Sequence, residues 1–211
     1  MIPEPVSSAA AENAISEVSQ AAEGLLKRLL GPAIDEAGLI LQDKVRVYRL
    51  KNTLRALDRV RALLSEANIE PRQVPLRALL PLLDGVSLED DEFLREKWAR
   101  LLASAASSTD EYLAHPSFAR ILSEMSAREA KLLDLMDSAI EPKSWPQFRT
   151  SAAKQLGVIE RVIDQDYGNL FRLGICRIRS HGNTLGDGTI EIGPFGSYFL
   201  SAIRGPKRVG A

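Results

Sequence analysis

Apolar residues recur at helical spacing along most of this chain, which predicts a mostly α-helical fold. Residues 9–30 are expected to form one helix, ending at Gly31 and Pro32 because these residue types commonly close helices. Residues 33–67 are expected to form one very long helix with two apolar stripes. The first stripe comprises Val47, Leu50, Leu54, Leu57 and Leu64, and the second comprises Leu41, Val45 and Tyr48.

A helix over residues 33–67 would be about 50 Å long at about 1.5 Å per residue, which exceeds the width of a small domain. Two apolar stripes require two packing partners, and a monomer would leave one of them exposed. The pattern therefore predicts a homodimer.

Shorter helices are predicted in the middle of the chain. Residues 74–83 form a near-continuous apolar run, which the Asp-Gly pair at 84–85 would close as a turn. Residues 87–90 fit a capping box, which predicts the start of a helix through Ala106. Within this helix we expect Trp98 to be the largest buried apolar side chain.

Two further helix starts are visible in the sequence. Residues 115–116, His-Pro, open a short helix that we expect to end at Met125, with His115 as a turn residue or helix cap. Residues 126–129, Ser-Ala-Arg-Glu, form a second capping box, which begins the next helix.

The last third of the chain has a different pattern. Helices are predicted at residues 127–139, 145–156 and 159–173, and short alternating strands at 175–180 and 189–193 flank the turn-rich HGNTLGDG. Three helices followed by a hairpin predict a winged-helix-like domain. The segments NLFRLGI and IGPFGSYFL resemble the elements with which winged helices end one helix and begin another, with Gly193 in place of the usual threonine.

These patterns divide the chain into four parts. We expect a flexible tip at residues 1–8, a helical domain at 9–125, a winged-helix-like domain at 126–205 and a basic tail at 206–211. The fold class is mostly α, with one very long helix in the N-terminal region.

Composition restricts the location and the partners of the protein. Lys+Arg number 27 and Asp+Glu number 28, so no global basic field draws the chain to nucleic acid or anionic lipid. The N-terminus lacks a secretory pattern, and no apolar run reaches the roughly 18 residues of a membrane span. A single Cys176 cannot form an internal disulfide. We therefore expect a cytoplasmic protein without membrane insertion.

The sequence contains no recognisable catalytic or metal-binding pattern. The two histidines, His115 and His181, are far apart in sequence, which disfavours a histidine-based metal or triad site. The acidic run at 89–92 matches the preference for negative charge at a helix start, and HGNTLGDG lacks the phosphate-loop pattern. We predict no enzyme activity, no cofactor and no metal ligand.

Two segments of opposite charge stand out. Residues 44–61 hold seven Lys or Arg and one acid, whereas residues 84–96 hold six acids and one Arg. The opposite charges predict contact within the chain or across a dimer, while a solvated helix face and a polyanion site remain open. The candidate interaction residues here are Arg46, Arg49, Arg55, Arg59, Glu89, Asp90, Asp91 and Glu92.

The predicted wing is a second candidate surface. Arg177 and Arg179 alternate on one strand and could contact phosphate, as could Arg204, Lys207 and Arg208 near the end of the chain. The preceding helix, however, begins with Glu160, Asp164 and Asp166 beside Arg161, and these acids would repel a DNA backbone. Nucleic-acid binding is therefore disfavoured, and a protein-binding winged helix is preferred.

The block VPLRALLPLLDGVSLEDDEFLREKWARLLAS at residues 74–104 resembles the middle of the abortive infection alpha family of bacterial phage-defence proteins. That family has a PL-x-x-LLPLL core, an LEDD segment and a Trp-Ala-x-Leu-Leu helix. The likeness extends from GPAIDEAGLILQDKVRVYRLKN through HPSFARILSEMS to GPFGSYFL. It implies a cytoplasmic accessory of antiphage defence, in which infection is sensed or answered by stopping the host cell, and it brings no catalytic residues.

Two functions remain open on the sequence. The first is a non-enzymatic antiphage protein that acts through contacts with a host or phage protein. The alternative is a winged-helix transcription regulator of defence or mobile-element genes. A gel-shift assay against the upstream region of the protein's own gene, at near-physiological salt, would separate them.

Overall fold

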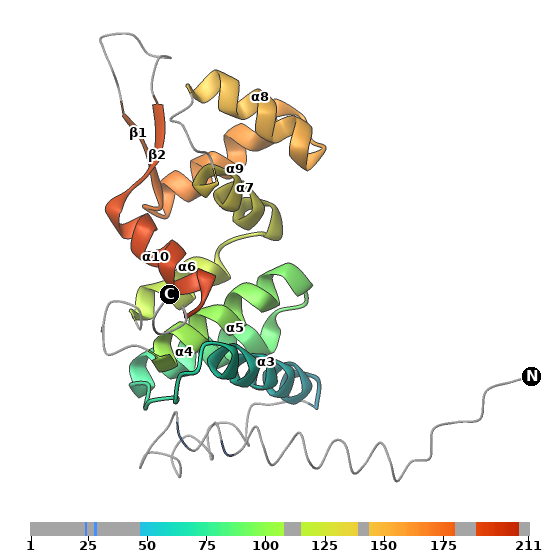
Figure 1. The fold of residues 1–211 in the computed structure, drawn as a ribbon. Coiled ribbons are helices and arrows are strands. Elements are labelled where there is room, and N and C mark those ends of the chain that lie inside the picture. Colours follow the sequence, from blue (N-terminus) through green and yellow to red (C-terminus); the bar gives the residue numbers. More distant parts are fainter. Residues whose placement is uncertain are drawn as a thin grey trace, which may run out of the picture. The chain divides into compact units, whose positions relative to one another are not determined.

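The computed structural model describes residues 24, 28, 47–107, 115–138, 144–179 and 189–206. Within these residues, Figure 1 shows mostly helices and one small antiparallel sheet, which confirms the predicted mostly α-helical class. The chain divides into two compact units, unit 1 (Met1–Ala119 with Arg204–Ala211) and unit 2 (Arg120–Ile203). None of the described helices is both long and apolar enough to span a bilayer.

The described part of unit 1 contains α3 (Val47–Glu66), α4 (Leu76–Leu88) and α5 (Glu92–Ser107), and α3 packs against both of the others. Its core contains the predicted stripe residues Leu57 and Leu64, which are 2% exposed, whereas Leu50 is half-exposed. The first stripe therefore faces the core in the second half of α3, from Leu57 to Leu64, and Leu54 is half-buried.

The very long helix expected over residues 33–67 is described only from Val47 onward, as α3. It ends at Glu66, as the sequence predicts, and Asn68 follows with a φ of 57°. Asparagine tolerates this left-handed conformation, which commonly terminates helices. The expected portion before Val47 and the second-stripe residues Leu41 and Val45 lie outside the described residues.

The predicted turn at residues 84–85 is wrong, because α4 continues to Leu88. Gly85 lies inside the helix, and a Cβ atom there would be 2.3 Å from Cη2 of Trp98. The glycine therefore serves the close approach of the indole ring rather than a turn. Trp98 is 2% exposed, which confirms its predicted burial.

The predicted capping box at residues 87–90 is also wrong. Ser87 lies within α4, and its hydroxyl donates to the carbonyl of Asp84 at 2.7 Å. Helix α5 begins at Glu92, where the Asp91 carboxylate accepts a hydrogen bond from the Leu94 N–H at 3.0 Å. Asp91 is therefore the N-terminal cap of α5.

The helices of unit 2 begin near the positions that the sequence predicts. After α6 (Pro116–Ser123), within which the unit boundary falls, come α7 (Ala127–Asp137), α8 (Trp145–Leu156) and α9 (Glu160–Arg172). Ser126 and Glu129 form the predicted capping box at the start of α7.

The hairpin and a final helix complete unit 2. Strand β1 (Cys176–Arg179) pairs antiparallel with β2 (Thr189–Ile192), and α10 (Pro194–Arg204) follows. Gly196 in α10 lies against the backbone of Ile175, the residue that precedes β1. A Cβ atom at Gly196 would be 2.0 Å from the carbonyl oxygen of Ile175. The start of α10 is thereby packed closely onto the hairpin.

Candidate functional site

The two segments of opposite charge meet within unit 1. Arg49 of α3 forms an ion pair with Asp84 of α4 and donates to the Ser87 hydroxyl at 2.9 Å. Arg59 of α3 makes two hydrogen bonds to Glu96 of α5, at 2.8 and 2.9 Å. The predicted contact between these segments therefore occurs inside one chain.

Glu96 is the centre of the larger of these clusters. It accepts a further hydrogen bond from Nε of Arg100 at 2.7 Å, while Arg59 also reaches Glu66 at 3.4 Å. The hydrogen bond from Arg59 lowers the pKa of Glu96 against the opposing effect of burial, and the same bond raises the pKa of Arg59. These charges are thus engaged in holding α3 on α5.

The remaining candidate acids have local structural roles or are exposed. Glu89 accepts hydrogen bonds from the Asp91 N–H at 2.9 Å and from the Trp98 indole N–H at 3.3 Å. Asp91 caps α5, whereas Asp90 and Glu92 are exposed. The acidic run therefore shapes the turn between α4 and α5, as negative charge at a helix start favours.

A buried amide supports the same turn. Asn52 of α3 is 3% exposed, and its Nδ2 donates to the carbonyl oxygens of Ser87 at 3.3 Å and Glu89 at 3.4 Å. These carbonyls lie at the end of α4, where intrahelical partners are missing. Sequence reasoning missed Asn52, because its partners are 35 and 37 residues away.

Most of the other candidate basic residues are exposed, paired or outside the described residues. Arg55 is exposed on α3, and Arg46 lies outside the described residues. In the hairpin, Arg177 forms an ion pair with Glu191, its partner in the strand register. Arg179 lies opposite Thr189 in that register. Lys207 and Arg208 are also outside the described residues.

The acids of α9, which we expected to repel a DNA backbone, each form an ion pair with an arginine of unit 2. Arg149 of α8 reaches Glu160 at 2.8 Å and Asp164 at 3.4 Å. Arg128 of α7 binds Asp166 through two hydrogen bonds of 2.6 and 2.9 Å. The Asp166 side chain is 5% exposed, and its hydrogen bonds raise the pKa of Arg128.

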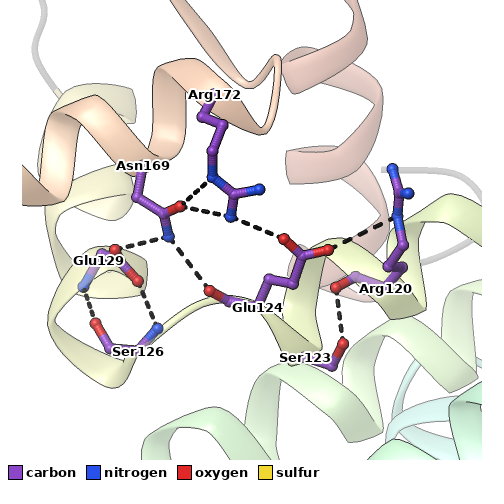
Figure 2. A network of polar contacts seen from close by, with 7 residues as sticks. All are labelled: Arg120, Ser123, Glu124, Ser126, Glu129, Asn169 and Arg172. Atoms are coloured by element: carbon purple, nitrogen blue, oxygen red, sulfur yellow. Dashed lines mark hydrogen bonds and ion pairs between the residues drawn. The ribbon is translucent and has the colours of Figure 1, made fainter.

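Figure 2 shows a polar network between the end of α9 and the turn from α6 to α7. The Asn169 amide donates to Glu129 at 2.8 Å and to the Glu124 carbonyl at 3.3 Å. Arg172 donates to Asn169 Oδ1 at 2.7 Å and to the Glu124 carboxylate at 2.8 Å. Glu129 also belongs to the Ser126 capping box, so one network joins the start of α7 to the end of α9.

Most residues of the NLFRLGI segment, at positions 169–175, have a structural role in unit 2. Leu170 and Ile175 are fully buried, and Gly174 has a φ of 74°. Asn169 and Arg172 supply the polar bonds described above. Phe171 has no such role and is 55% exposed, which leaves its side chain available for contact with another molecule.

The lone thiol lies in the core of unit 2. Cys176 is 3% exposed, and burial raises its pKa to about 12. Burial also raises the pKa of the neighbouring Tyr167, whose ring lies 4.4 Å from that of Trp145 between centroids. A thiol with so high a pKa is not a nucleophile at neutral pH.

The first histidine has the predicted capping role. The Nδ1 atom of His115 accepts a hydrogen bond from the Ser117 N–H at 3.2 Å, at the start of α6. His181 lies outside the described residues. Across the described part of the chain, no three His, Cys, Asp or Glu side chains are grouped so that they could hold a metal ion.

One cavity of about 470 Å³ lies beside the end of α3 in unit 1. Its lining includes Arg61, Ser65, Asn68 and Glu70. Arg61 lies 3.8 Å from Asp58, and the described side chains of this lining include no nucleophile–base pair.

In the part of this mostly helical protein that the structure describes, charged residues therefore mainly stabilise helix contacts and helix ends. The model of the abortive infection alpha family matches residues 42–203. The chain therefore belongs to the abortive infection alpha family, as the sequence motifs indicated. Neither the curated proteins nor the solved structures gave a significant match.

Proposed function

We propose that this chain is a non-enzymatic antiphage protein that acts through contacts with a host or phage protein. Its membership of the abortive infection alpha family is the observation that carries this proposal, since abortive infection is a response to phage. The paired charges and the inert thiol of the described residues support a function by contact rather than by chemistry.

Unit 2 is the part that we propose as the contact module. Its order of three helices and a hairpin supports a winged-helix-like fold, as does an isolated antiparallel bridge between Ser144 and Thr189. Exposed apolar side chains favour protein contacts. Among the described residues of unit 2, the exposed large apolar side chains are Ile159, Phe171, Phe195 and Tyr198.

The charge of unit 2 does not favour nucleic acid. Its sequence contains as many Asp and Glu as Lys and Arg, and Arg177 is already paired with Glu191. Phosphate binding needs cations that can replace counterions. We therefore prefer a protein partner, and no described feature adds support for the transcription regulator.

We also propose that the protein acts as a homodimer in the cytoplasm. The half-exposed Leu50 on α3 supports further packing of this helix. The single thiol, buried in unit 2, fits a reducing compartment.

Plaque counts on bacteria that express the protein with its native neighbours test the proposed function. Wild type should lower phage yield, and Ile159→Glu should reduce protection by removing an exposed apolar contact. Arg177→Gln/Arg179→Gln should leave protection largely intact. This wing variant removes charge without placing like charges opposite Glu191.

Two results would contradict the proposal. Wild type could fail to reduce plaque counts, or the wing variant alone could lose protection while wild type shows salt-sensitive DNA binding. Thermal melts of both variants must match wild type, so that any loss of protection reflects the surface and not the fold.

A further inference from the structure

The outer face of α9 contains a glycine without an internal packing role. Gly168 is exposed in the middle of the helix, and no atom of the described residues lies within 4 Å of a Cβ built there. By contrast, Gly85 and Gly196 each allow a close contact inside their own unit. Glycine is unfavourable in a helix interior, so its place on this face is consistent with the close approach of another molecule.

The side chains around Gly168 have a self-complementary order. Asp164 lies four residues before the glycine and Arg172 four residues after it; Gln165 lies three before and Phe171 three after. All four are exposed, and residues at these spacings share a helix face. Two copies of α9, antiparallel and crossing at Gly168, would therefore place Asp164 against Arg172 and Gln165 against Phe171.

We propose that this face of α9 is the surface through which two copies of the chain associate. The pairing is isologous, because each contact occurs twice around a two-fold axis. It places Asp164 of each copy next to Arg172 of the other copy, and it covers the exposed ring of Phe171. A glycine at the crossing lets the two backbones come close enough for these side chains to meet.

The inference deepens the proposed homodimer and rests on it. Asp164 and Arg172 already have partners inside unit 2, Arg149 at 3.4 Å and Glu124 at 2.8 Å, so the contacts between copies add to existing networks. One helix face is a small interface compared with the roughly 1,200–2,000 Å² of stable complexes. The association is therefore weak and is best detected by trapping.

Cysteine cross-linking tests the geometry directly. In Gly168→Cys the two new thiols would face each other at the crossing, and mild oxidation should produce a covalent dimer in most of the protein. The native Cys176 is 3% exposed and should not react. A disulfide needs Cα atoms within roughly 7 Å, so its formation reports a close crossing.

Arg161→Cys is the matched control, because it is exposed on the same helix. It lies seven residues from Gly168, or about 10 Å along the helix axis, so the two copies of Cys at this position would be about 20 Å apart in the antiparallel pair. It should remain uncross-linked. Equal cross-linking of both variants would show random collision and overturn the proposal.

Light scattering coupled to size exclusion provides the second measurement. Wild type should show an average mass that rises with concentration, and Gly168→Trp should remain monomeric with an unchanged circular dichroism spectrum. A wild type that is monomeric at every concentration and gives no cross-link would refute both the dimer and this face. A dimer that persists in Gly168→Trp would refute the face alone.

The functional assay separates this inference from phage defence. Protection by a strictly monomeric wild type would leave defence by contact with another protein standing while refuting self-association. Binding of duplex DNA by wild type that Gly168→Trp abolishes, without any cross-link in Gly168→Cys, would assign the face to nucleic acid and overturn the proposal.

Discussion

The same substitution, glycine to alanine, should have opposite effects in two helices of this protein. In α4, a Cβ at Gly85 would lie 2.3, 2.6 and 2.7 Å from three atoms of the Trp98 ring. In α9, a Cβ at Gly168 would meet no atom of the described residues within 4 Å. A comparison of Gly85→Ala with Gly168→Ala therefore separates the effect of helix propensity on stability from the effect of packing.

The expected magnitudes follow from these distances. Alanine is favoured over glycine in a helix interior by about 1 kcal/mol, which sets the gain for Gly168→Ala at about 0.5–1 kcal/mol. At Gly85 the same gain is opposed by overpacking, which typically costs about 1–3 kcal/mol. Trp98 is 2% exposed and cannot turn away into solvent, so the clash should win, with a net loss of up to about 2 kcal/mol.

Chemical denaturation of wild type and both variants gives the free energies of unfolding, with thermal melts as a second measure. Gly85→Ala should lower the midpoint and Gly168→Ala should raise it. Trp98→Phe removes the ring atoms that clash, so Gly85→Ala should cost much less in that background, giving a coupling in a double-mutant cycle.

A neutral or stabilising Gly85→Ala would refute the packing of the indole on α4. So would strict additivity of Gly85→Ala and Trp98→Phe, because residues in contact should show coupling. A destabilising Gly168→Ala would show that this glycine has an internal role.

Two further predictions concern unit 1. Trp98→Ala should destabilise the protein by about 3–5 kcal/mol, because it removes the largest fully buried side chain of the described residues, and a thermal melt equal to that of wild type would contradict its burial. The pKa of Glu96 is lowered from its usual value of 4.5, so its ion pairs stabilise the fold above that pH, and this contribution is lost as the pH falls through the depressed pKa. Melting temperatures measured from neutral pH down into this range should therefore fall less steeply in Glu96→Gln than in wild type, and parallel profiles would refute the assigned role.

Local chemistry allowed the helix boundaries of unit 2 to be predicted from the sequence. The capping box of Ser126 and Glu129 involves groups three residues apart, so the motif contains both partners and the start of α7 could be recognised. Helix α8 lies at residues 145–156, as the sequence predicts.

The same local reasoning failed where a distant residue decides the conformation. An Asp-Gly pair usually marks a turn, yet Gly85 continues a helix because Trp98 needs the space beside it. Ser87 looked like a cap, but Asn52 from α3 binds its carbonyl and helps to end α4 beyond it.

The function of the charged residues also depended on tertiary structure. The sequence alone determined the helical class, the two segments of opposite charge and the family motifs, because these depend on composition and short spacings. Only the folded chain determined that Asp166 is buried against Arg128, 38 residues away, and that Glu96 binds Arg59. An exposed charge and a paired charge look the same in a sequence, since their difference is a distance in space.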